Sequence, residues 1–292
     1  IGTPSSAGAY APGQEKAPAA LRAAGLVSLL GDVEDRGDSE LWRWRPDPSE
    51  PYAQNLDAVV AAARSTADRV RIAAAEGRRV LVLGGDCTVG VGTLAGLPAG
   101  TGLLYFDMHP DLNVPSSVPD GALDWMGLAH MLGQPGTRPQ LSTVGGDAPL
   151  LLPHEVLLFG YRPDQLTPHE RDTIARLSLD GIDQAEVAID PESAARDALA
   201  RMDGRCERIA IHFDVDVIDF TDAPLSEHTG RNIGLPFEAA MRALEVLLES
   251  DRVAALTITE LSPAHGAEDG STLRRFVERL AQALAPQARA SL

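Results

Sequence analysis

The segment from residue 101 to residue 116 places three possible metal ligands directly after a short apolar run. Residues 103–106 have the composition of a buried strand, and Asp107, His109 and Asp111 follow at alternate positions. Alternate side chains of an extended chain point to one face, so these three would leave the strand end together. Two carboxylates and an imidazole in that arrangement can bind a divalent metal ion. Asp and Pro are also ordinary turn residues, so this stretch alone leaves both interpretations open.

A second stretch, residues 208–220, repeats the pattern with His212, Asp214 and Asp216 on one face of another apolar strand. Burying carboxylates without partners is costly, so two apolar strands that both end in acids indicate nearby cations. Four carboxylates from the two strands would bridge two divalent ions about 3.5–4 Å apart, the spacing typical of two-metal hydrolases. Such a pair of ions lowers the pKa of a bridging water and supplies hydroxide at neutral pH.

Composition limits the class of protein and its partners. The chain has 292 residues, 44% of them hydrophobic, which is enough for one large domain or two small ones. A formal net charge of -17 and a pI near 4.7 argue against nucleic acid or an anionic membrane as a partner, and are compatible with a cationic substrate. Two cysteines make no disulfide framework, and no apolar stretch approaches ~18 residues. The first residues lack the features of a signal peptide, so we expect a cytoplasmic protein.

Strand-like and helix-like segments alternate along the chain, which is typical of a parallel sheet covered on both faces. The patterns predict strands at 79–85, 103–107, 156–161, 185–189, 207–213 and 253–260. They predict helices at 19–30, 53–76, from 88 onward, and at 123–132, 167–177, 191–202, 236–250 and 271–284. No linker-like break is evident, so we expect a single α/β domain over residues 1–292. Sites in such sheets form beyond the carboxyl ends of the strands, where the acids cluster here.

Four motifs at these strand ends resemble, in order, those of the arginase/agmatinase (ureohydrolase) family. They are Gly84-Gly85-Asp86-Cys87, Asp107-Met108-His109-Pro110-Asp111, Asp214-Val215-Asp216-Val217-Ile218-Asp219 and Glu260-Leu261-Ser262-Pro263. Residues 8–22 also look like the family's N-terminal segment, so the resemblance covers nearly the whole chain. It implies a three-layer α/β/α fold with a central, mostly parallel sheet. It also implies a binuclear manganese centre that hydrolyses guanidino or related C–N bonds, often with release of urea.

The resemblance assigns roles to matching positions. Asp107 and Asp214 would bridge the two metal ions, with Asp111 on the first ion and His109 and Asp216 on the second. A bridging hydroxide would attack the guanidinium carbon. Glu260 would hold the guanidinium NH groups, because a carboxylate matches a planar cation; its alternative is a capping or surface acid.

Two positions depart from the family's pattern. Cys87 stands where the family usually has a metal-binding His. A thiolate suits zinc or iron better than manganese, whereas a neutral thiol would not bind. The resemblance implies two Mn(II) ions, and Cys87 makes zinc, iron or nickel the alternatives. His212 stands where the family commonly has a small residue, and is either a substitute ligand, a partner of the metal-bound water or a core histidine.

The proton relay and the substrate contacts also differ. Asp124 occupies the position at which the family has a proton-shuttling His, and His130 is the nearby alternative. Asn113 matches a residue that contacts the amino-acid carboxylate in arginases, whereas Asp120, where a hydroxyl would assist, would repel a carboxylate. Arg231 lies in the loop after the second acid motif and would meet an anionic substrate end, or be an ordinary surface charge.

These features predict a metal-dependent, urea-releasing amidinohydrolase whose small guanidino-type substrate is not arginine itself. The alternatives are a non-catalytic or regulatory paralogue with the same fold, and a hydrolase of a formimino or amide C–N bond. Because family members are commonly trimers or hexamers, the resemblance also implies a homo-oligomer.

Overall fold

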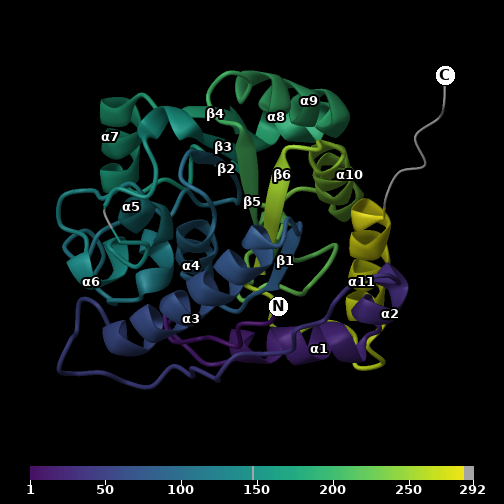
Figure 1. Cartoon of the computed structure of the whole chain (residues 1–292), viewed down its shortest axis with the longest axis horizontal. Helices are drawn as coiled ribbons and strands as arrows, with labels where there is room; N and C mark the ends of the chain where they lie inside the picture. The colour runs from purple at the N-terminus through teal and green to yellow at the C-terminus, as the bar shows by residue number, and fades with distance from the viewer. Residues whose placement is uncertain (147, 286–292) are drawn as a thin grey trace.

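The centre of the protein is a six-stranded sheet in which every pairing between strands is parallel (Figure 1). This computed structural model describes residues 1–146 and 148–285. The strands, in sheet order, are β1 (Val80–Leu83), β6 (Val253–Thr259), β5 (Arg208–Asp214), β2 (Thr101–Phe106), β3 (Val156–Tyr161) and β4 (Asp180–Asp183). The predicted α/β class and parallel sheet are thus confirmed, with no antiparallel strand in the described sheet.

Helices cover both faces of the sheet, so that α3 and α4 lie on one side and α10 and α11 on the other (Figure 1). The first face carries α3 (Leu56–Ala75), α4 (Val89–Gly96), α5 (Gly127–Met131), α6 (Pro139–Ser142) and α7 (Pro168–Leu177). The second carries α1 (Ala17–Ala23), α2 (Leu26–Leu30), α8 (Gln184–Ile189), α9 (Pro191–Arg201), α10 (Phe237–Leu248) and α11 (Ser271–Leu284). Short 3-10 helices are η1 (Gln14–Lys16), η2 (Leu123–Met126), η3 (Pro153–Glu155) and η4 (Val215–Val217). None of the described helices combines the length and apolarity needed to cross a membrane.

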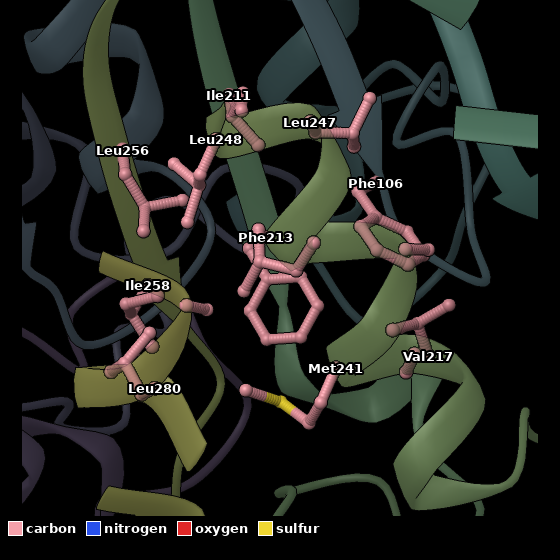
Figure 2. Packing of buried hydrophobic residues seen from close by; sticks show 14 of the residues in the cluster. Phe106, Ile211, Phe213, Val217, Met241, Leu247, Leu248, Leu256, Ile258 and Leu280 are labelled. Atoms are coloured by element: carbon pink, nitrogen blue, oxygen red, sulfur yellow. The ribbon is translucent and has the colours of Figure 1, made fainter. Parts of the chain in front are cut away.

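Strand side chains alternate between two hydrophobic cores. On β2, Leu104 and Phe106 belong to the core under α10, whereas Leu103 and Tyr105 belong to the core under α3. Figure 2 shows Leu247 and Met241 of α10 beside the rings of Phe106 and Phe213, whose centroids are 5.1 Å apart. Leu280 of α11 lies beside Ile258 of β6. Burying each such ring contributes about 1.5–3 kcal/mol, and this fixes the strands that carry the site.

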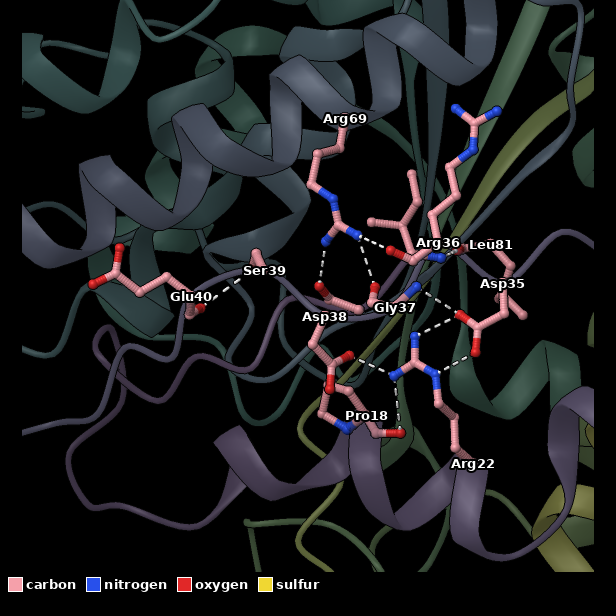
Figure 3. Close-up of polar contacts among 12 residues, drawn as sticks. Pro18, Arg22, Asp35, Arg36, Gly37, Asp38, Ser39, Glu40, Arg69 and Leu81 are labelled. Carbon is pink, nitrogen blue, oxygen red and sulfur yellow. Dashed lines mark hydrogen bonds and ion pairs between the residues drawn. The ribbon is translucent and has the colours of Figure 1, made fainter.

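Two arginines hold the long connection between α2 and α3 against the body of the protein (Figure 3). Arg22 of α1 donates to Asp35 at 2.8 Å and also pairs with Asp38. Arg69 of α3 donates to the carbonyls of Gly37 at 2.7 Å and Arg36 at 2.7 Å. Backbone acceptors that a loop would otherwise leave to water are satisfied in this way.

Two predicted elements were wrong. The helix expected at 19–30 is two helices, because Gly25 adopts a left-handed φ of 95° between α1 and α2. The strand expected at 185–189 is helix α8, and the strand lies just before it, at β4. Asp183 accepts from the backbone of Glu186, whose side chain accepts in return from the backbone of Asp183. This reciprocal cap starts a helix where an apolar alternation favoured a strand.

Candidate metal centre

Four adjacent strands, β1, β6, β5 and β2, deliver the candidate site at their carboxyl ends. Cys87 follows β1, Asp107 follows β2, and Glu260 follows β6, while Asp214 is the last residue of β5. Gly85 lets the N-terminal segment pass close to this edge, because a Cβ there would lie 1.7 Å from the carbonyl oxygen of Ser5. The acids are therefore gathered by the sheet rather than by a flexible loop.

Tight turns after β2 and β5 aim the carboxylates inward. Asp107 Oδ1 accepts from the backbone N–H of His109 at 2.6 Å, and Asp214 Oδ1 accepts from that of Asp216 at 2.7 Å. His109 Nδ1 lies 3.0 Å from Asp216 Oδ2. The remaining oxygens, Asp107 Oδ2 and Asp216 Oδ1, are buried without a hydrogen-bond partner among the described residues. Unpaired buried carboxylate oxygens are the donors that a divalent cation requires, so the site fits a metal.

Burial and mutual repulsion set the electrostatics of this cluster. Burial, followed by the charges of Asp214 and Asp111, raises the pKa of Asp107 well above its ordinary value. Burial, together with the charge of Asp216, does the same to the pKa of Asp214. Burial opposes a charged His109, but the adjacent Asp216 carboxylate outweighs it and raises the pKa of His109 to about 9. Bound cations would relieve the repulsion that these shifts express.

Possible ligand atoms form three groups, in each of which all atoms lie within 4.8 Å of one another. The groups are Cys87, Asp107, His212 and Asp214; Asp107, His109 and Asp216; and Cys87, Asp124 and Glu260. Asp111 is in none of these groups among the described residues. Instead its carboxylate accepts a hydrogen bond from the Tyr105 hydroxyl, and its backbone has a left-handed φ of 48°.

A cavity of about 320 Å³ opens above these groups. Acids from several segments line it: Asp111, Asp120, Asp124, Asp214, Asp216, Glu227 and Glu260. His109, His228, Tyr10, Trp125 and Cys87 complete the described lining, which includes no lysine or arginine. The sequence patterns did not single out Tyr10, Trp125 or Glu227, because nothing in their local sequence marks them as part of this cavity.

Glu260 is held in an unusual backbone conformation, with a left-handed φ of 62°. Its N–H donates to the Gly85 carbonyl at 2.7 Å, and its carbonyl accepts from Glu227 at 2.8 Å. The buried Gln14 side chain donates through Nε2 to Glu260 Oε2 at 3.3 Å. Glu260 Oε1 is buried and has no hydrogen-bond partner among the described residues, and Glu260 lines the cavity. A carboxylate oxygen is thus left for a ligand with N–H donors.

The two candidate proton-relay residues lie in different environments. Asp124 lines the cavity, and its Oδ1 accepts from the backbone N–H of Cys87 at 2.6 Å. Burial raises the pKa of Asp124 well above its ordinary value, with the charge of Asp86 as a further cause. His130 is not among the described lining residues; its Nδ1 contacts the Met126 carbonyl at 2.7 Å, and its Nε2 accepts from the backbone of Arg138 at 3.0 Å. Both ring nitrogens of His130 are therefore engaged by backbone groups, and of the two candidates Asp124 is the one that lines the cavity.

Of the three further residues expected to contact the substrate, only Asp120 lies at the described cavity. Asp120 lines the cavity at an exposed position. Asn113 is fully buried, its Oδ1 accepts from Ser117 and Thr167, and it is not among the described lining residues. Arg231 is exposed, with its guanidinium 5.1 Å from the centre of the Phe220 ring, and is not among them either. The geometry thus does not support substrate contacts by Asn113 or Arg231.

Comparisons with known proteins find relatives that cover most of the chain. The model of the arginase family matches residues 1–285. Arginase of Brevibacillus brevis is 30% identical over 275 residues, covering 90% of this chain and 89% of the relative. The crystal structure of Bacillus subtilis arginase has a TM-score of 0.85 at 27% identity and covers 99% of this chain and 98% of that chain. B. subtilis formimidoylglutamase shares the fold, with a TM-score of 0.72 at 16% identity, over 98% of this chain and 87% of that chain.

A parallel sheet that gathers buried acids at its strand ends, together with a match along the chain, defines the class of protein. The chain belongs to the arginase family. Within that family it is a hydrolase that acts on C–N bonds of linear amidines, and the ligand groups support dependence on a divalent metal. It is a divergent member, since Cys87 replaces a histidine expected there.

Proposed function

We propose that the protein is an amidinohydrolase that releases urea from a cationic guanidino compound other than arginine. The observation that carries this proposal is the unpaired, buried Glu260 Oε1 in a cavity whose described lining is acidic and contains no lysine or arginine. A guanidinium offers planar N–H donors to such a carboxylate. A free substrate carboxylate would meet Asp120 and Glu227 and be repelled.

The proposed metal ligands are the acids and bases at the strand ends. Asp107 and Asp214 would be shared between two divalent ions, with His109 and Asp216 at one end and Asp111, Cys87 and His212 as candidates at the other. Manganese is the first expectation, with zinc, iron and nickel as alternatives. When bound, the metal pair supplies Lewis acidity and an activated water.

The chain's own residues would bind the substrate and handle the proton. Glu260, held by Gln14, would orient the guanidinium. Asp124 lies in one ligand group with Glu260 and has a raised pKa because it is buried, so it would carry the proton that the leaving nitrogen needs. Asp120 and Glu227 would face the far end of the substrate.

The test is a screen of guanidino compounds of one chain length that end in an ammonium, a hydroxyl or a carboxylate. With divalent metal present, we expect urea release in the order ammonium, hydroxyl, carboxylate, and none with Asp214→Ala. Preference for the carboxylate compound would contradict the proposed substrate class. Loss of all turnover with every compound and every metal would favour the non-catalytic alternative.

A second candidate is hydrolysis of a formimino group, which the fold shared with formimidoylglutamase brings into consideration. A formimino compound of the same chain length, added to the screen, would identify it by release of formamide in place of urea. A single domain, a homo-oligomer (a trimer or hexamer) and a cytoplasmic location are further parts of the proposal. Light scattering on the purified chain tests the oligomer.

A further inference from the structure

We propose that the two ends of this metal centre differ in kind, and that Cys87 and His212 form a soft site that selects zinc over manganese. The inference rests on the proposed function only in taking the acid cluster as a metal centre. What it adds is the identity of the ion that each end prefers.

Two of the three described ligand groups are unlike sets that share one residue. Asp107 belongs both to the group with Cys87, His212 and Asp214 and to a second group with His109 and Asp216. Since Asp107 Oδ2 has no hydrogen-bond partner in the part of the chain that the structure describes, this carboxylate can serve adjacent ions. One set has only carboxylates and an imidazole, whereas the other adds a thiol.

The ligand group that contains Cys87 and His212 is buried and is held in place by the sheet. Cys87 is 3% exposed and His212 is 1% exposed. Cys87 Sγ lies 2.8 Å from Asp214 Oδ2, so the thiol faces a carboxylate of the centre. The His212 ring stacks on Tyr105, with centroids 4.3 Å apart and planes 7° apart.

The two nitrogens of the His212 ring have different neighbours. His212 Nε2 lies 3.1 Å from Thr259 Oγ1, and Nδ1 is buried without a partner among the described residues. Gly90 makes room for this ring, since a Cβ there would lie 2.6 Å from Nδ1. Thr259 Oγ1 also lies 3.5 Å from Cys87 Sγ, so Nε2 is on the side of the thiol and is the nitrogen that a metal ion held by Cys87 would bind.

Asp111 belongs to none of the described ligand groups. The Tyr105 hydroxyl donates to Asp111 Oδ2, and the same Tyr105 ring supports His212. This end of the centre therefore offers the nitrogen of His212 and the sulfur of Cys87 beside the carboxylates of Asp107 and Asp214. Thiolate and imidazole favour zinc, whereas manganese prefers carboxylates and water. On binding, the Cys87 thiol would lose its proton to solvent as the sulfur–metal bond forms.

Cobalt(II) reports directly on a thiolate ligand. We would prepare the metal-free full-length chain and titrate it with Co²⁺ while recording the near-ultraviolet sulfur-to-cobalt charge-transfer band. The band is expected in the wild-type protein and in Cys206→Ser, the matched control for the other cysteine. It is expected to be lost in Cys87→Ser. A band that survives in Cys87→Ser would overturn the proposal.

Direct competition tests the selectivity. Equimolar Zn²⁺ and Mn²⁺ should leave one zinc ion per wild-type chain after desalting. The variants Cys87→Ser and His212→Gln should each weaken zinc binding by at least about ten-fold, with manganese binding at the His109 end within about two-fold. Equal zinc affinities of Cys87→Ser and Cys206→Ser would contradict a thiolate site.

X-ray absorption on the zinc-loaded wild-type protein needs no variant and so does not depend on a mutant folding. A sulfur neighbour about 2.3 Å from zinc supports the proposal, and its absence at full occupancy overturns it. None of these measurements uses turnover. If no metal–sulfur signal is found, the zinc site is refuted and the urea-release assay still decides the proposed function. If a zinc–sulfur signal is found without turnover, only the proposed function is contradicted.

Discussion

Gln14 is the residue whose contribution is clearest at the scale of single side chains. It is fully buried and donates to Glu260 Oε2, which leaves Oε1 for a ligand. We expect Gln14→Leu to raise KM for a guanidino substrate about ten-fold with a smaller effect on kcat, because a hydrogen bond to a carboxylate is worth about 1.5–3 kcal/mol. Steady-state kinetics measure this split.

The control for that experiment is Gln134→Leu. Gln134 is also buried but bonds to the Leu132 carbonyl and to Arg176, away from the cavity. Its replacement should lower stability without changing KM. Equal changes in KM for the two variants would refute the positioning role of Gln14.

His130 has a structural role that predicts a pH dependence. Burial lowers its pKa from 6.5 to about 4. Between pH 4 and pH 6.5 the unfolded chain binds the proton more tightly than the folded one. The contribution of neutral His130 to the free energy of unfolding is therefore complete above pH 6.5 and is lost as the pH falls toward 4. The loss is about 3 kcal/mol for one buried group. Denaturant unfolding at pH 6.5 and 4.5 should show a smaller difference for His130→Gln than for the wild type.

At the scale of elements, the contact between α3 and α4 depends on two glycines. A Cβ at Gly92 would lie 2.4 Å from the Ala63 carbonyl oxygen, and one at Gly96 would lie 2.5 Å from that of Ala67. Gly92→Ala should therefore destabilise the protein by about 1–3 kcal/mol through overpacking. Because α4 begins just after Cys87, metal affinity should fall as well.

Urea denaturation and metal titration check this prediction. Ala61→Gly, at an exposed position of the same helix pair, is the control and should cost about 1 kcal/mol without affecting the metal. Unchanged stability of Gly92→Ala would mean that the two helices can move apart freely, contrary to the close packing described.

At the scale of the whole molecule, a chain of net charge -17 concentrates buried acids at one edge of its sheet. Burial raises the pKa of Asp107 and Asp214, and that of Asp111 to about 8. Acids with raised pKa stabilise the metal-free fold when protonated and destabilise it as pH rises through those values. Metal removal should therefore lower the melting temperature more at pH 8 than at pH 5.

Thermal melts with and without chelator measure the effect. Adding back metal at 100 times its Kd should restore about 2.7 kcal/mol for each site. Asp214→Asn is the informative variant, because it removes one repelling carboxylate and one ligand together. It should be more stable than the wild type when metal-free, and respond less to metal. A melting temperature that is independent of metal at both pH values would argue against a metal centre.

Much of the fold could be predicted from the sequence, because alternating helices and apolar strands with this composition have few other arrangements. The all-parallel sheet and the predicted helix at 271–284 follow from such local periodicity. The break at Gly25 and the helical state of α8 could not be predicted in this way. The first depends on one glycine and the second on one side-chain cap. Periodicity averages over many residues and does not register a single backbone exception.

The types and spacing of Asp107, His109, Asp214 and Asp216 by themselves indicated a cation site, because alternate residues of a strand share a face. Only the tertiary structure brought Gln14 to Glu260, 246 residues apart, and placed Glu227 beside the cavity. It also showed Tyr105 holding Asp111 and left His130 and Arg231 outside the described lining. Such contacts depend on how separate elements meet, and no local pattern encodes that distance.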